Sequence, residues 1–150
     1  MKFALLFAVS TLPLLSGCYR EQPASGSIHL DEIPEKVAVL TIQEGFAIDF
    51  GSVPPGETGE AILTIENTGP YPATEFKQTT EPETPFSFKD GSFPGTGGSC
   101  TDRIEPDATC TLVITYEPDQ LGSSEKTIEM SYVNGVLEFP LHFVVLGTSE

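Results

Sequence analysis

Thiols and imidazoles supply the candidate chemistry of this sequence, at Cys18, Cys100, Cys110, His29 and His142. An acyl-transfer site needs a nucleophile beside a histidine or a substitute base that a third group orients. There are only two histidines and no Gly-x-Ser-x-Gly segment, and a copper/zinc sandwich enzyme would need several histidines. Carboxylates are plentiful, but their spacing marks no shared site. The sequence therefore predicts a protein that is not an enzyme, with no catalytic residue and no cofactor.

The first cysteine, Cys18, follows an apolar run that extends from Phe3 to Leu15 behind Met1-Lys2. This run is shorter than the about 20 residues of a membrane-spanning helix but fits the apolar region of a secretory signal. The segment Leu15-Ser16-Gly17-Cys18 resembles the lipobox of bacterial lipoproteins at all four positions. The resemblance implies a signal peptide over residues 1–17, a diacylglycerol thioether on Cys18 and an acylated (for example palmitoylated) new N-terminus.

Lipidation of Cys18 is the leading interpretation, and an ordinary signal peptide with an incidental cysteine is the alternative. Two or three acyl chains, at about 0.8 kcal/mol per buried CH₂, anchor a protein stably where one chain would not. Tyr19 follows the cysteine, where an aspartate tends to retain Gram-negative lipoproteins in the inner membrane. We therefore expect a bacterial cell-envelope protein, lipid-anchored in the outer membrane.

The two remaining cysteines, Cys100 and Cys110, form an even pair in an exported chain. Because the envelope is oxidising, a disulfide between them is expected. A two-thiolate metal site is the alternative, but neither histidine is near in sequence and there is no Cys-x-x-Cys segment. The sequence thus predicts a disulfide and no metal site.

The segment before Cys100, beginning at Lys89, is rich in glycine and carries Asp90, with Asp102 beyond the cysteine. Carboxylates and backbone carbonyls of this kind could bind calcium. The segment lacks the alternating acidic ligands of a dedicated calcium loop. A plain surface loop pinned by the disulfide is the favoured interpretation.

The chain is strongly acidic, with 22 Asp and Glu against 7 Lys and Arg over 150 residues, for a formal net charge of −15. Clustered Lys and Arg, which bind phosphates, are absent from the sequence, so nucleic acid and anionic lipid headgroups are poor partners. The acidic residues are spread along the chain, as on a solvated surface.

The chain divides into three parts. After the signal peptide, residues 18–35 are polar and contain Pro, Ser and Gly, which predicts a flexible tether of roughly 20–25 Å in which His29 is a bystander. Residues 36–150 show short apolar runs of period 2 between turn residues, as expected for a domain of seven to eight antiparallel strands. The expected strands are 36–42, 46–50, 60–67, 73–80, 85–91, 110–118, 126–133 and 136–146.

Two details of the last expected hairpin follow from local chemistry. Asn134-Gly135 predicts a type I′ turn, with positive φ at both residues. Pro140 cannot donate a ladder hydrogen bond, so we place it at an edge or facing away from its neighbour, with His142 on the outward face beside it. The domain is predicted to be an all-β, immunoglobulin-like sandwich.

Two stretches resemble the signature segments of ASH-type (abnormal-spindle and hydin) immunoglobulin-like domains, whose bacterial relatives are choice-of-anchor-D repeats. They run from Phe50 to Gly69, ending in Asn67-x-Gly69, and from Ile104 to Pro118, with Asp107 where the family often has Gly. These motifs consist of turns and core positions. The resemblance implies a non-enzymatic interaction module.

The sequence therefore predicts a lipid-anchored module that binds an unidentified protein or polymer of the envelope through an edge strand or loops. A structural or accessory subunit of an envelope assembly is the alternative, and a calcium-dependent adhesive module is a third hypothesis.

Overall fold

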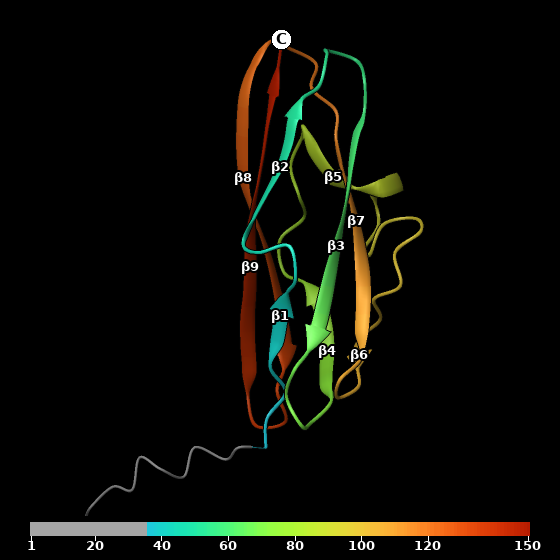
Figure 1. The fold of residues 1–150 in the computed structure, drawn as a ribbon, viewed down its shortest axis with the longest axis vertical. Coiled ribbons are helices and arrows are strands. Elements are labelled where there is room, and N and C mark those ends of the chain that lie inside the picture. Colours follow the sequence, from blue (N-terminus) through green and yellow to red (C-terminus); the bar gives the residue numbers. More distant parts are fainter. Residues whose placement is uncertain (1–35) are drawn as a thin grey trace, which may run out of the picture. The chain divides into compact units, whose positions relative to one another are not determined.

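The protein forms two facing β-sheets in a computed structural model that describes residues 36–150 (Figure 1). The predictions for Cys18, His29, the signal peptide and the tether lie outside the described residues. The first sheet has the order β1 (Leu40–Ile42), β3 (Gly59–Asn67), β7 (Thr109–Tyr116) and β5 (Phe86–Phe88). The second has the order β2 (Ala47–Ser52), β9 (Glu138–Ser149), β8 (Gly122–Val133), β4 (Ala73–Gln78) and β6 (Arg103–Ile104). A single 3₁₀ turn, η1 (Lys89–Gly91), follows β5.

The predicted immunoglobulin-like sandwich is confirmed, with differences in the number and direction of its strands. The structure has nine strands in its described part, one more than the upper expectation. The additional strand is β6, whose two residues pair with Ala73 and Thr74 of β4. Two residues are too short for an alternating pattern, so the sequence carried no signal for this strand. No helix among residues 36–150 is long and apolar enough to cross a membrane.

One pair of strands is parallel, where all were expected to be antiparallel. β1 pairs with β3, after which the chain turns at Gly45, and β2 then pairs with β9 of the other sheet in parallel. The Gly45 N–H donates to the Ile42 carbonyl at 3.2 Å, and Gly45 has a φ of +92°, which glycine adopts readily. Period-2 alternation identifies a strand but not its partner, so this crossing was not visible in the sequence.

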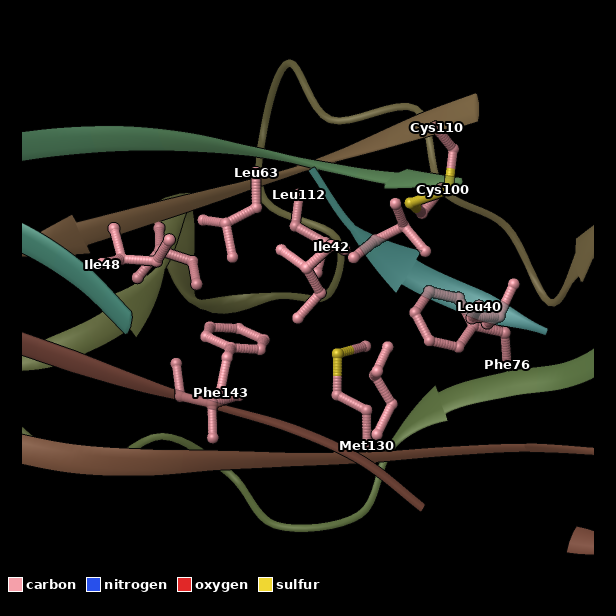
Figure 2. Packing of buried hydrophobic residues seen from close by; sticks show 14 of the residues in the cluster. Leu40, Ile42, Ile48, Leu63, Phe76, Cys100, Cys110, Leu112, Met130 and Phe143 are labelled. Atoms are coloured by element: carbon pink, nitrogen blue, oxygen red, sulfur yellow. A yellow bond between two sulfur atoms is a disulfide. The ribbon is translucent and has the colours of Figure 1, made fainter. Parts of the chain in front are cut away.

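The core fills the space between the two sheets (Figure 2). Residues of β3 and β7 that were expected inward, including Leu63, Ile65, Leu112 and Ile114, are fully buried. Phe86 stacks on Tyr116 with ring centroids 4.8 Å apart. Aromatic rings bury more apolar area than any other side chains, and this pair lies where β5 and β7 are in register. The sandwich is therefore held by one continuous apolar layer.

The turn between β8 and β9 lies one residue later than the predicted Asn134-Gly135 turn and is not of type I′. The Asn134 N–H donates to the Leu137 carbonyl, so Gly135 and Val136 are the central residues. Of these only Gly135 has positive φ, +101°, which is the pattern of type II′. The Asn134 side chain explains the shift, because its Oδ1 accepts the N–H groups of both Val136 and Leu137 at 3.0 Å.

Pro140 lies at an open edge, as expected. It is opposite Ser131 of β8, between the pairs Tyr132–Phe139 and Met130–Leu141. Hydrogen-bonded and non-hydrogen-bonded pairs alternate along an antiparallel ladder, and the bond from Asn134 to Leu137 fixes the alternation. The ring nitrogen of Pro140 consequently points away from β8, on a side that β2 does not reach, because β2 begins opposite Val144.

Candidate interaction surface

The described residues with chemical potential do not gather into one site. Cys100 and Cys110 form a disulfide, as predicted, with a Cα–Cα distance of 4.7 Å. His142 is exposed on the outward face of β9, opposite Glu129 of β8, as its position beside Pro140 indicated. Within residues 36–150 no group of three or more His, Cys, Asp or Glu side chains could hold a metal ion.

The segment considered for calcium covers the edge of β7. Its backbone follows this strand, with the Val113 N–H donating to the Pro94 carbonyl at 2.8 Å and the Ser99 N–H to the Thr111 carbonyl at 2.9 Å. Phe93 anchors it from beneath, edge-on to the rings of Phe76 and Phe88. The disulfide fixes its far end. The segment is therefore a surface loop held by the disulfide, which was the favoured interpretation. This loop covers one edge of the first sheet.

The Asn-x-Gly motif has a structural role, centred on the fully buried Asn67. Its Oδ1 accepts the N–H groups of Val39 and Gly69, both at 3.1 Å. Its Nδ2 donates to the carbonyls of Tyr71 at 2.7 Å and Ile104 at 3.1 Å. All four hydrogen bonds available to the amide are made, so one side chain ties the segment before β1 to the β3–β4 turn and to β6.

Gly69 belongs to the same junction. A Cβ atom at this position would lie 2.2 Å from the Val37 carbonyl oxygen and 2.6 Å from the Val39 nitrogen. Both are backbone atoms, and the Val39 nitrogen cannot move aside without breaking its hydrogen bond to Asn67. The motif is therefore explained by close approach of the backbone and not by ligand binding.

The first half of β3 is an open strand edge. The Thr64 carbonyl accepts from the Gln43 N–H, and the Thr64 N–H donates to the Glu44 carboxylate at 2.8 Å, so both backbone groups face the β1 side. Alternate residues of a strand direct these groups to the same side, which puts those of Glu60 and Ile62 there as well. β1 ends opposite Ile65, so no described strand pairs with β3 at Glu60 and Ile62.

The side chains along this edge differ in character. Ile62 points outward and is 57% exposed, although it lies in the middle of a strand. Two residues before it, Glu60 forms an ion pair with Lys89 at 2.6 Å, on the far side of β7. The hydrogen bond from Lys89 to Glu60, and the attraction between their charges, raise the pKa of Lys89. The edge thus presents free main-chain groups beside an apolar side chain, with its nearest charge already paired.

The second sheet also has an open edge, along the first half of β9, but this one contains Pro140. A shallow hollow of about 320 Å³ on the adjoining outward face is lined by residues of β8 and β9 together with Thr79. Proline at an edge removes a donor and blocks the pairing of a further strand. Of these two half-strand edges, that of β3 is consequently the better suited to bind an extended chain.

Sequence reasoning missed the residues that define these surfaces. Ile62 faces away from the core, as its alternation with Leu63 and Ile65 indicated. Nothing in the pattern showed that β1 would be too short to cover the first half of β3. Phe46 was expected inward with Ile48, yet it precedes β2 and is 67% exposed. The exposure of Ile62 and of Phe46 depends on where the chain crosses from the first sheet to the second, and the sequence did not reveal this crossing.

Comparison with protein families identifies one match, to the model described as HYDIN/CFA65/VesB-like, Ig-like domain, over residues 44–140. A comparison with curated protein sequences finds no match.

Among solved structures, the ASH/PapD-like domain of human CEP192 (PapD-like domain 7) is similar over 100% of this chain and 96% of its own, with 18% identity and a TM-score of 0.55. The VesB protease of Vibrio cholerae is similar over 73% of this chain but only 31% of its own, with 12% identity and a TM-score of 0.57. The YadV chaperone is similar over 74% of this chain and 52% of its own, with 14% identity and a TM-score of 0.50. At these identities the likeness concerns the fold alone.

Proposed function

Because the chain belongs to the HYDIN/CFA65/VesB-like family of Ig-like domains, we propose that it is a lipid-anchored protein of the bacterial cell envelope that binds another protein or polymer. The fold is consistent with a non-enzymatic interaction module. The lipobox at Leu15–Cys18 supports the anchor, and Tyr19 after the cysteine supports the outer membrane.

The observation that carries the binding proposal is the open edge of β3. An extended segment of a partner can add to such an edge, where main-chain hydrogen bonds supply affinity and alternate side chains supply specificity. The other edges of the first sheet differ: its outer strands, β1 and β5, are each only three residues long, and loop 92–100 bonds along β7. Ile62 offers an apolar contact for one side chain of the added strand.

The anchor is tested by replacing Cys18 with Ala and separating membranes from soluble material. We expect the wild-type protein in the membrane fraction and the variant in the soluble envelope fraction. Retention of the Cys18→Ala variant in membranes would show that the anchoring proposal is wrong.

The edge is tested by in-cell photocrosslinking from position 62, with position 121 as control. Leu121 is also an exposed aliphatic residue, 72% accessible, in the β7–β8 loop. We expect a discrete crosslinked partner from position 62 and none from position 121. Glu60→Pro, introduced with the crosslinker at 62, removes an N–H that no described strand uses and should abolish the product without unfolding the domain.

The possible results discriminate between the two functional classes. Equal crosslinking from both positions, or a product that Glu60→Pro leaves unchanged, would contradict binding through β3. A partner that copurifies in fixed stoichiometry and does not exchange would indicate the alternative, a structural subunit of an envelope assembly.

A further inference from the structure

One end of the domain exposes five large apolar side chains. They are Val39, Tyr71, Val136, Leu137 and Phe139, with exposed fractions of 42%, 43%, 62%, 55% and 44%. We call this group the apolar end.

Hydrogen bonds join the backbone segments that carry these residues. The Ala38 N–H donates to the Asn134 carbonyl at 2.9 Å, joining the segment before β1 to the β8–β9 turn. Asn67 bonds to the backbones of both Val39 and Tyr71. Tyr71 reaches the turn as well, since a Cβ on Gly135 would lie 3.7 Å from its Cδ1. In Figure 1 the start of the described chain, the β3–β4 turn and the β8–β9 turn lie at the same end.

The fold does not require these residues to be apolar. Val136 occupies the second central position of the turn, where polar residues fit as well. Leu137 and Phe139 continue the inward-facing series of Leu141 and Phe143, but beyond the covered part of the core, so they gain only partial burial. Phe139 touches the core through Tyr132, with ring centroids 6.3 Å apart. Clustered apolar side chains that stability does not explain indicate a surface that is covered in use.

The connection to the proposed anchor determines what can cover this end. The described chain begins at Lys36, three residues before Val39, and 17 residues separate it from Cys18. A coil of that length spans roughly 20–25 Å on average. The opposite end of the sandwich, where Gly122 pairs with Ser149, lies a further ~40 Å away along the 12 residues of β8. The apolar end is thus the part of the domain that the tether keeps near the bilayer.

The carboxylate that lies among the apolar residues of the β8–β9 turn is already paired. Glu138, between Leu137 and Phe139, is engaged by the Ser131 hydroxyl at 2.7 Å and by Lys77 at 3.7 Å. Tyr71 combines an aromatic body with a polar tip, a combination that is common at membrane–water interfaces. Electrostatic attraction to anionic headgroups is not available to this acidic chain, so the contact must be apolar.

We propose that the apolar end of the domain rests on the surface of the membrane in which Cys18 is anchored. This inference depends on the proposed lipid anchor and adds to it a fixed orientation, with the C-terminal end and the open edge of β3 directed away from the lipid. The tether then limits the distance between the domain and the bilayer, and the apolar contact limits the rotation of the domain relative to the membrane.

Tryptophan fluorescence can test this contact because the chain contains no tryptophan. The lipidated full-length protein is reconstituted into vesicles of phosphatidylethanolamine and phosphatidylcholine, with brominated acyl chains as quencher. Leu137→Trp places the probe in the apolar end, and Leu121→Trp places it at the opposite end. We expect blue-shifted, quenched emission from position 137 and unquenched emission from position 121, with unchanged melting temperatures.

Flotation of the same vesicles separates failure of the anchor from failure of the contact. If the protein floats with the vesicles but neither tryptophan is quenched, the anchor stands and the contact is overturned. Equal quenching at both positions overturns the orientation. Failure to float overturns the anchor and the contact with it. Val136→Asp, in the Leu137→Trp background, should restore emission without releasing the protein, whereas Leu121→Asp should not.

Discussion

The side-chain amide of Asn67 donates to the backbone carbonyl of Tyr71 at 2.7 Å, which links the most densely bonded buried residue of the domain to its apolar end. The same amide holds Val39 on the other side of that end. The turn that presents Tyr71 is therefore fixed by an interaction inside the core, and it does not need a partner to become ordered.

Replacing Asn67 with Ala should strongly destabilise the domain. The change leaves two N–H groups and two carbonyls without their partner, and each buried group left unsatisfied costs about 1–3 kcal/mol. We expect the free energy of unfolding to fall by about 3 kcal/mol or more in urea. Gln43→Ala is the matched control, since its amide donates to Glu66 on the surface at 3.1 Å and its loss should cost less than about 0.5 kcal/mol. Similar losses in both variants would contradict the role assigned to Asn67.

Replacing Asp107 with Gly should stabilise the protein. Asp107 has a φ of +59°, in the left-handed region that costs most residues about 1–2 kcal/mol and glycine almost nothing. After the entropy that glycine loses on folding, a net gain of about 0.5–1 kcal/mol is expected from thermal or urea unfolding. Asp119→Gly, at a position without positive φ, should give no gain. A loss of stability in Asp107→Gly would show that the aspartate contributes more than its strain costs.

Removing the disulfide in the double variant Cys100→Ala/Cys110→Ala should cost about 2.5–3 kcal/mol of unfolding free energy in the chain-entropy model. It should also loosen the loop over β7. The amide of Val113, which bonds to Pro94, would then exchange its hydrogen faster than the amide of Ile114. Unchanged exchange at Val113 would show that Phe93 and the loop backbone hold the edge without the disulfide.

The titration of Glu138 tests the environment of the apolar end. The hydrogen bond from Ser131, followed by the charge of Lys77, lowers the pKa of Glu138 below its ordinary value of 4.5. A lowered folded-state pKa contributes stability above the unfolded pKa, and this contribution is lost as the pH falls through the folded value. Ser131→Ala and Lys77→Gln should each raise the pKa of Glu138 measured by NMR. An unchanged pKa in Ser131→Ala would contradict the role of this hydrogen bond as the largest cause.

Local chemistry in the sequence was sufficient to predict most of the sandwich. Alternation in residues 110–116 and 126–132 identified the inward faces of β7 and β8, and the even pair of cysteines identified the disulfide. Pro140 was placed at an edge because a residue without a backbone N–H is tolerated at few positions in a sheet. The unusual residue of the second family segment, Asp107, is also explained, because it occupies a conformation that glycine would adopt without strain.

What the sequence could not supply depends on contacts between distant segments. The type II′ turn arises because the Asn134 carbonyl is used by Ala38, which leaves the Asn134 side chain to bond the turn. The parallel pairing of β2 and the exposure of Phe46 and Ile62 follow from where the chain changes sheets. The candidate surfaces are defined by these features, so they could be found only in the folded chain.

The crossing of the chain from β1 in the first sheet to β2 in the second has a consequence for neighbouring copies of the protein. Besides the outer strands of each sheet, two inner strands are left open along half of their length: the first half of β3, far from the apolar end, and the first half of β9, near it. If several copies were anchored in one membrane in the same orientation, the open halves of β3 and β9 would lie at different distances from the bilayer. The open half of β3 would then lie level with β2 of a neighbouring copy, and not with the open half of its β9, where Pro140 blocks pairing. If the proposed anchor concentrates molecules in two dimensions, this offset keeps the open halves of β3 and β9 in neighbouring copies from pairing with each other.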